Sequence, residues 1–231
     1  MNLDGLMSGL VAASVWVLPV LFAITLHEAA HGYAAKRFGD DTALRAGRVT
    51  LNPLRHVDLY GTIIIPAALL IFKAPFLFGY AKPVPVNFGR LNHPRRDMVW
   101  VAAAGPGINL VLAYVSALAL HAVPLAPDWA APWISMNLQN SLIINVVLAV
   151  FNMLPLPPLD GGRVAVGLLP DAIALPLARL ERFGLAILIA ALFLLPYLGA
   201  RVGLDLNIFR WLVGIPTGFL IELVATLAGH G

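Results

Sequence analysis

Long apolar stretches alternate along this chain with short polar loops. A helix that crosses a bilayer needs about 20 mostly apolar residues, so each long uncharged stretch predicts a membrane span. Four stretches without Asp, Glu, Lys or Arg satisfy this condition: residues 5–26, 98–127, 129–159 and 183–200. The pattern predicts an all-α polytopic membrane protein.

Two further apolar stretches are weaker candidates for spans. At about 1.5 Å per residue, residues 59–72 would reach only about 21 Å, less than the roughly 30 Å of the hydrocarbon core. Residues 211–228 carry Glu222 in their middle. Because glycines and prolines interrupt the first of these stretches, we expect a short re-entrant or extended hairpin over residues 59–78. The expected total is five to six transmembrane helices.

The distribution of basic residues predicts an orientation. No Lys or Arg occurs in residues 1–26, whereas five follow the first span: Lys36, Arg37, Arg45, Arg48 and Arg55. Since cytoplasmic loops carry an excess of Lys and Arg, the N-terminus is expected outside and the loop after the first span in the cytoplasm. We expect a single membrane-embedded domain over residues 1–231, with a core at 5–168 and C-terminal helices at 169–231.

The composition excludes several classes of protein. Hydrophobic residues make up 60% of the chain and charged residues 12%, against roughly 45–50% and about 25% in soluble domains. A soluble globule and a disordered chain are therefore excluded. The net charge is only +3, with no dense basic run, so a nucleic-acid partner is not expected. The chain has no cysteine, so a metal ion would have to be held by His, Asp or Glu.

The motif His27-Glu28-Ala29-Ala30-His31 indicates metal chemistry. Residues four apart share a helix face, so the two imidazoles can bind one Zn²⁺ while Glu28 acts as general base on a water bound to it. Each ionisable residue at the middle of a span costs on the order of 2.5–3.5 kcal/mol, and a metal ion would offset that cost. The alternative is that the span ends at Leu26 and the motif is an ordinary polar helix end at the membrane surface.

Asp160 is the candidate for a third ligand, because catalytic zinc sites have three protein ligands and one open position. It follows an uncharged run whose prolines stop the helix and leave carbonyls without partners. At membrane depth such backbone is tolerated only inside protein or beside a wet cavity. The alternative is a Pro-Gly turn in which Asp160 caps a helix from Gly162 onward.

Several motifs, in this order, resemble the site-2 proteases, a family of intramembrane zinc metalloproteases. The sequence HEAAH resembles the metal-binding helix of the family, and residues 152–161, NMLPLPPLDG, are similar to its Asn-x-x-Pro-x-Pro-x-Leu-Asp-Gly signature. Shorter matches lie in the middle core helix, at residues 104–109, and in two loops, at 52–58 and 79–87. The resemblance covers most of the chain up to about residue 168.

The resemblance implies one Zn²⁺ per chain, held by His27, His31 and Asp160, with Glu28 as the catalytic base. It implies hydrolysis of peptide bonds in or near transmembrane segments of single-span membrane proteins. It also implies a compact bacterial-type member without a PDZ or CBS domain, in the inner membrane, with the active site open to the cytoplasm. Other compact members have a span before the metal-binding helix, which here comes first, so their span count and substrate entrance are not carried over.

Four further residues are candidates for substrate binding. Asn109 and Asn152 lie in predicted spans, where an asparagine either bonds neighbouring helices together or orients a substrate. Pro83 and Pro85 remove amide donors from one edge of an extended segment, so Val84 and Val86 could pair with an extended substrate from the other edge. The alternative is a proline-stiffened connector. The other histidines are expected to be ordinary loop or interface residues: His56, His93, His121 and His230.

The favoured function is therefore regulated proteolysis inside the membrane. A non-proteolytic membrane metal-binding protein or transporter is the alternative. Glu28 separates the two, because a transporter needs metal ligands but no base beside them. The sequence indicates neither a particular substrate nor an oligomeric state.

Overall fold

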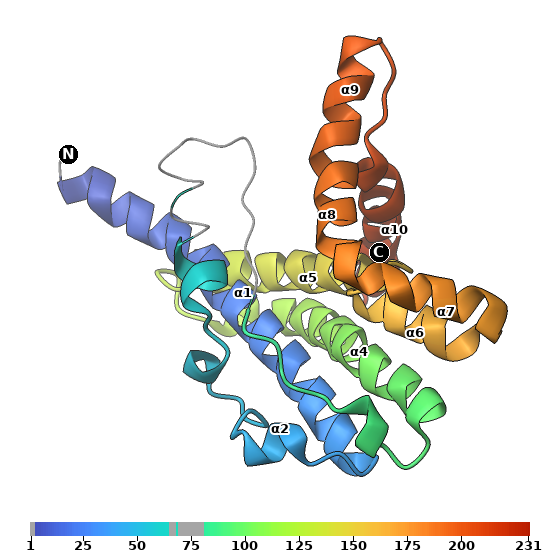
Figure 1. Ribbon diagram of the computed structural model, residues 1–231. Helices are drawn as coiled ribbons and strands as arrows, with labels where there is room; N and C mark the ends of the chain where they lie inside the picture. Colours follow the sequence, from blue (N-terminus) through green and yellow to red (C-terminus); the bar gives the residue numbers. More distant parts are fainter. Residues whose placement is uncertain (1–2, 65–67, 69–80) are drawn as a thin grey trace.

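The computed structural model describes residues 3–64, 68 and 81–231, and these contain helices and loops but no strand (Figure 1). The longer helices are α1 (Leu3–Arg37), α4 (Pro94–Leu120), α5 (Ala131–Asn152) and α10 (Ile215–Leu227). The shorter α-helices are α2 (Thr42–Arg45), α6 (Asp160–Leu168), α7 (Asp171–Arg179), α8 (Gly184–Ile189) and α9 (Leu195–Arg201). Short 3-10 and π-helical segments are η1 (Pro53–Arg55), η2 (Leu59–Ile64), η3 (Phe88–Arg90), η4 (Val123–Leu125), η5 (Leu180–Phe183), η6 (Ala190–Leu194) and η7 (Arg210–Gly214).

The predicted all-helical membrane fold is confirmed. Within the described residues, four helices are long and apolar enough to cross a membrane: Val11–Arg37, Pro94–Leu120, Ala131–Asn152 and Arg210–Leu227. A helix pair, Asp171–Phe183 and Ala186–Arg201, bends by 78° and would make a fifth span if counted as one. The predicted hairpin at residues 59–78 lies outside the described residues, apart from residues 59–64 and residue 68.

The HEAAH motif lies within a candidate span, as the favoured interpretation predicts. α1 continues through the motif to Arg37, so the helix itself does not end at Leu26. Lys36 and Arg37 lie in its last turn, where cations interact favourably with the helix dipole. Gly39 follows at φ +103°, the left-handed conformation that commonly ends a helix.

α4 is the central helix of the bundle and packs against α1, α5 and α6. Small side chains let helices approach closely in a membrane. On α4, Ala113 and Ala117 are fully buried against apolar residues of α5 and the C-terminal helix α10. At that end the rings of His121 and His230 stack with centroids 4.0 Å apart, and each ring bonds a backbone carbonyl. The two histidines thus join the end of α4 to the C-terminal end of the chain.

An extended connector, residues 81–87, lies along the C-terminal half of α1 and is tied down by side chains (Figure 1). At its start, the Arg48 guanidinium donates to the Lys82 carbonyl. At its end, the Asn87 amide donates to Asp40 Oδ2 at 2.7 Å. Asp40 is completely buried and also accepts the Thr42 amide at 3.0 Å. The Asp40 carboxylate therefore joins the end of α1 to the connector.

Removing that carboxylate should destabilise the fold. Asp40→Ala leaves two amide donors without an acceptor, and a buried unsatisfied group costs about 1–3 kcal/mol. We expect the free energy of unfolding, measured by denaturation in detergent, to fall by about 2 kcal/mol or more. The control is Asp41→Ala, which loses only partly exposed ion pairs with Arg45 and Arg90 and should cost less than about 1 kcal/mol.

The stabilisation by Asp40 should also depend on pH. Burial raises the pKa of its carboxyl, but hydrogen bonds from Thr42 and Asn87 and the charge of Arg90 outweigh this, so the pKa lies below its ordinary value of 3.8. A group with a lowered folded-state pKa stabilises fully above its unfolded pKa and loses that effect as pH falls through the folded pKa. The difference between wild type and Asp40→Ala should be constant from about pH 5 to 7 and shrink below about pH 4. A difference that grows on acidification would contradict this assignment.

Candidate metal centre

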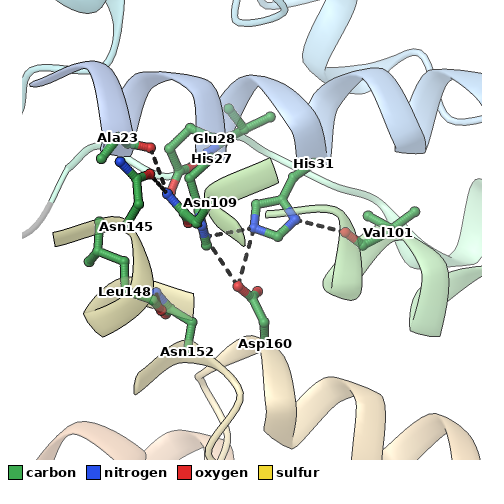
Figure 2. A network of polar contacts seen from close by, with 11 residues as sticks. Ala23, His27, Glu28, His31, Val101, Asn109, Asn145, Leu148, Asn152 and Asp160 are labelled. Atoms are coloured by element: carbon green, nitrogen blue, oxygen red, sulfur yellow. Dashed lines mark hydrogen bonds and ion pairs between the residues drawn. The ribbon is translucent and has the colours of Figure 1, made fainter. Parts of the chain in front are cut away.

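Three buried donor atoms converge at the middle of the bundle (Figure 2). His27 and His31 lie one turn apart on α1, and their Nε2 atoms are 3.0 Å apart. Asp160 Oδ2 lies 3.2 Å from the first of these nitrogens and 3.3 Å from the second. The exposed fractions of the three residues are only 6%, 8% and 6%. The structure thus brings together the three residues that the sequence singled out as ligands.

The hydrogen-bond partner of Nδ1, the outer ring nitrogen that points away from the other two donors, identifies the tautomer of each histidine. His27 Nδ1 lies 2.6 Å from Asn109 Oδ1, and His31 Nδ1 lies 2.7 Å from the carbonyl oxygen of Val101. Because these oxygens only accept, each Nδ1 carries the proton in the neutral ring, and each Nε2 presents a lone pair. Two lone pairs and a carboxylate oxygen at about 3 Å repel one another unless a cation lies between them. Asp160 Oδ2, moreover, accepts no conventional hydrogen bond.

This donor set fits zinc. Two imidazoles and one carboxylate are a common ligand set of catalytic zinc sites, which keep a fourth position open for water or substrate. The outer hydrogen bonds from Nδ1 to carbonyl oxygens are the arrangement that orients histidine ligands around a metal. His27, His31 and Asp160 could therefore hold a metal ion.

Gly105 of α4 supplies the space beside these donors. A Cβ atom placed on Gly105 would lie 2.4 Å from His31 Nε2 and 2.6 Å from His27 Nε2. No real side chain carbon approaches so closely, so only glycine fits. The sequence alone did not single out Gly105. Gly105 lies four residues before Asn109 and therefore on the same helix face, which is the feature that could have indicated its role.

A tight return of the chain positions Asp160. α5 ends at Asn152, and α6 begins at Asp160 itself, where the helix dipole favours a negative charge. Because Asp160 is the first residue of α6, the alternative in which it caps a helix that starts at Gly162 is wrong.

Two glycines let the proline-rich turn pack against the start of α6. A Cβ on Gly161 would lie 2.2 Å from the Met153 carbonyl oxygen, and one on Gly162 would lie 2.2 Å from the Pro157 nitrogen.

Glu28 lies beside the donors and is held by the connector. Its Oε2 accepts a hydrogen bond from the Val84 amide at 2.7 Å. Val84 itself is buried, and Gly32, one turn further along α1, leaves the room for it: a Cβ there would lie 3.3 Å from Val84 Cγ1. The Val84 amide is thus directed at Glu28 in this structure. Pairing of Val84 and Val86 with a substrate stays a prediction.

The two candidate asparagines differ in their surroundings. Asn109 is completely buried, and its amide bonds His27, Asn145 and the Ala23 carbonyl. Asn152 is half-buried at the end of α5 and donates to the Leu148 carbonyl of its own helix at 3.0 Å (Figure 2). Asn109 therefore orients His27 in this structure. A substrate contact by either residue stays a prediction.

Apolar helices around a buried His-His-Asp group define a membrane protein with a candidate metal centre, and comparison with known proteins gives its family. Residues 15–126 and 121–195 match the family described as "Peptidase family M50". The chain belongs to this family, the site-2 proteases, and is a membrane zinc metalloprotease of that type.

Two relatives illustrate the similarity. "Putative zinc metalloprotease YwhC" of Bacillus subtilis is 38% identical over 198 residues, which cover 80% of this chain and 82% of the relative. "Putative zinc metalloprotease Rip2" of Mycobacterium tuberculosis is 31% identical over 203 residues, which cover 87% of this chain and 74% of the relative. No solved structure matches the chain significantly.

A methyl group at position 105 should abolish metal binding. Gly105→Ala would push both imidazoles away from the shared position, and we expect the affinity for zinc to fall by about 100-fold or more. The measurement is zinc content and competition with a chromophoric chelator in detergent. Gly107→Ala is the matched control, because nothing lies within 4 Å of a Cβ at that position. Equal zinc affinity of the two variants would contradict the site.

Proposed function

We propose that His27, His31 and Asp160 hold one Zn²⁺ and that Glu28 is the base in hydrolysis of peptide bonds within membrane-spanning substrates. The observation that carries this proposal is the convergence of two Nε2 lone pairs and a carboxylate oxygen within 3.3 Å. A second carboxylate, that of Glu28, lies next to these three donors and is bonded by the backbone amide of Val84. A site that only bound a metal would not need this second carboxylate.

The residues divide the chemistry between them. Zinc bound at such a site polarises the scissile carbonyl and acidifies a water molecule. Glu28 accepts a proton from the attacking water and then delivers it to the nitrogen of the leaving amine. The Val84 amide bonds Oε2 and so fixes the carboxylate, while the other oxygen, Oε1, is left to carry the proton.

The substrate class follows from the depth of the site and from backbone chemistry. The two histidine donors lie on α1 within a candidate membrane span. A transmembrane helix hides each carbonyl in a bond to the amide four residues later, so the substrate must unwind before it is cut. We propose a single-span membrane protein whose unwound segment lies beside the connector, where β-addition would hold it extended.

The site is proposed to face the cytoplasm. Beyond His31, α1 ends in Lys36 and Arg37, and Arg48 bonds the backbone of Lys82 in the adjoining connector. Basic residues concentrate on the cytoplasmic side of membrane proteins. Water and substrate would therefore reach Glu28 from the side of these polar loops, in the inner membrane of a bacterium.

The test separates proteolysis from metal binding. A panel of single-span membrane proteins is co-expressed with the wild type and with Glu28→Gln, which keeps the shape of the side chain but removes the base. We expect fragments with the wild type and a loss of about 10²- to 10⁴-fold in cleavage rate in the variant. Zinc content should stay unchanged in Glu28→Gln and be lost in Asp160→Ala. Identical fragments from wild type and Glu28→Gln would exclude Glu28 as the base.

The connector offers a second prediction. Val84→Pro removes the amide that holds Glu28, and because a hydrogen bond to a charged group is worth about 1.5–3 kcal/mol, kcat should fall by about 10- to 100-fold with little change in KM. Val86→Pro is the matched control, since its amide does not bind Glu28. If Val86 pairs with the substrate, that variant should instead raise KM at unchanged kcat. An unaltered kcat in Val84→Pro would show that the amide has no part in positioning the base.

A further inference from the structure

The two histidine ligands are oriented in different ways. The proton on His31 Nδ1 is fixed by the Val101 carbonyl, a backbone group that cannot turn round. The proton on His27 Nδ1 depends on the side-chain amide of Asn109, at 2.6 Å. An amide can rotate by 180° and present its NH₂ group instead of its oxygen. His27 would then need its proton on Nε2, and the lone pair for the metal would be lost.

Asn145 of α5 opposes this rotation. Asn109 Nδ2 donates to Asn145 Oδ1 at 2.7 Å and to the Ala23 carbonyl at 3.3 Å (Figure 2). If Asn109 were rotated, its oxygen would face two acceptors and its NH₂ group would face His27. The hydrogen-bond partners of Asn109 thus all favour one orientation.

Asn145 is itself oriented by the backbone of its own helix. Its Nδ2 donates to the Ser141 carbonyl at 2.8 Å, which leaves Oδ1 directed at Asn109. The orientation is therefore passed from a backbone carbonyl of α5, through Asn145 and Asn109, to His27 on α1. Asn145 is 1% exposed and Asn109 is 0% exposed, so water does not compete for these bonds.

We propose that Asn145 is a positioning residue that, through Asn109, holds His27 in the tautomer that binds the metal. The proposal rests on the assignment of His27 as a ligand. It goes further by giving a role to a buried side chain that touches neither the donors nor Glu28. If Asn145 served only to hold α5 against its neighbouring helices, the orientation of the Asn109 amide would not matter.

The test compares variants of the full-length protein in detergent. Asn145→Leu removes the acceptor for Asn109 and should weaken zinc binding by about 10-fold, the lower end of the range for outer hydrogen bonds, because Asn109 itself remains beside His27. The matched control is Asn140→Leu, which loses an α5–α1 bond to the Val15 carbonyl but no contact with Asn109. It should stay within about threefold of wild type.

A double-mutant cycle identifies the cause. A carboxylate has no donor face, so Asn109→Asp should hold His27 in the required tautomer without help from Asn145. Its second oxygen then faces Asn145 Oδ1 and the Ala23 carbonyl, so Asn145→Leu removes an unfavourable contact in that background. In that background the effect of Asn145→Leu should shrink to less than about threefold. If Asn145→Leu does not fold, Asn145→Ser replaces it, because its shorter hydroxyl bonds its own helix and no longer reaches Asn109.

The tautomer of His27 is a readout independent of zinc. In the metal-free protein with ¹⁵N-labelled histidine, the ring of His27 should carry its proton on Nδ1 in the wild type and partly on Nε2 in Asn145→Leu. Its signals are assigned by comparison with His27→Ala. Unchanged zinc affinity and an unchanged tautomer in Asn145→Leu would overturn the proposal. A wild type that shows this tautomer but binds no zinc would overturn the ligand assignment instead.

Discussion

The meeting of two imidazole lone pairs and one carboxylate oxygen in an apolar bundle is the interaction on which the rest of the structure depends. Charged and polar groups are costly to bury, and these three side chains are nearly inaccessible to solvent. In the neutral rings the Nδ1 protons face acceptors, so neither Nε2 has a proton to donate to the other ring or to Asp160. A divalent cation could satisfy all three donor atoms at once, and Gly105 leaves space beside them.

Four helices share that arrangement. α1 provides two candidate ligands and the neighbouring Glu28, and α6 begins with the third candidate. α4 approaches through Gly105, whose missing side chain leaves the centre open, while its Asn109 lies behind one imidazole. α5 adds Asn145 and ends where the proline-rich turn starts. Each helix therefore contributes both to the bundle and to the geometry of the donors.

The convergence of the three candidate ligands was predictable from the sequence, because local spacing and a recognisable motif indicate them. Two histidines four apart share a helix face in any fold, and Asp160 lies in a recognisable Pro-Gly signature. Gly105 and Asn145 were not predicted to serve the metal centre, because their roles depend on which helices pack together. The continuation of the first helix through the motif was predictable as well, because the spacing of His27 and His31 requires a helix there.

Because of the contact between Glu28 and the Val84 amide, metal binding and orientation of the Glu28 carboxylate depend on different parts of the chain. Each of the three candidate metal ligands belongs to a helix, α1 or α6, whereas the Glu28 carboxylate is oriented by an extended segment outside them. Displacing that segment would release the carboxylate and leave the three candidate ligands in place. Binding of a metal at this site would therefore not by itself ensure that the carboxylate is correctly oriented.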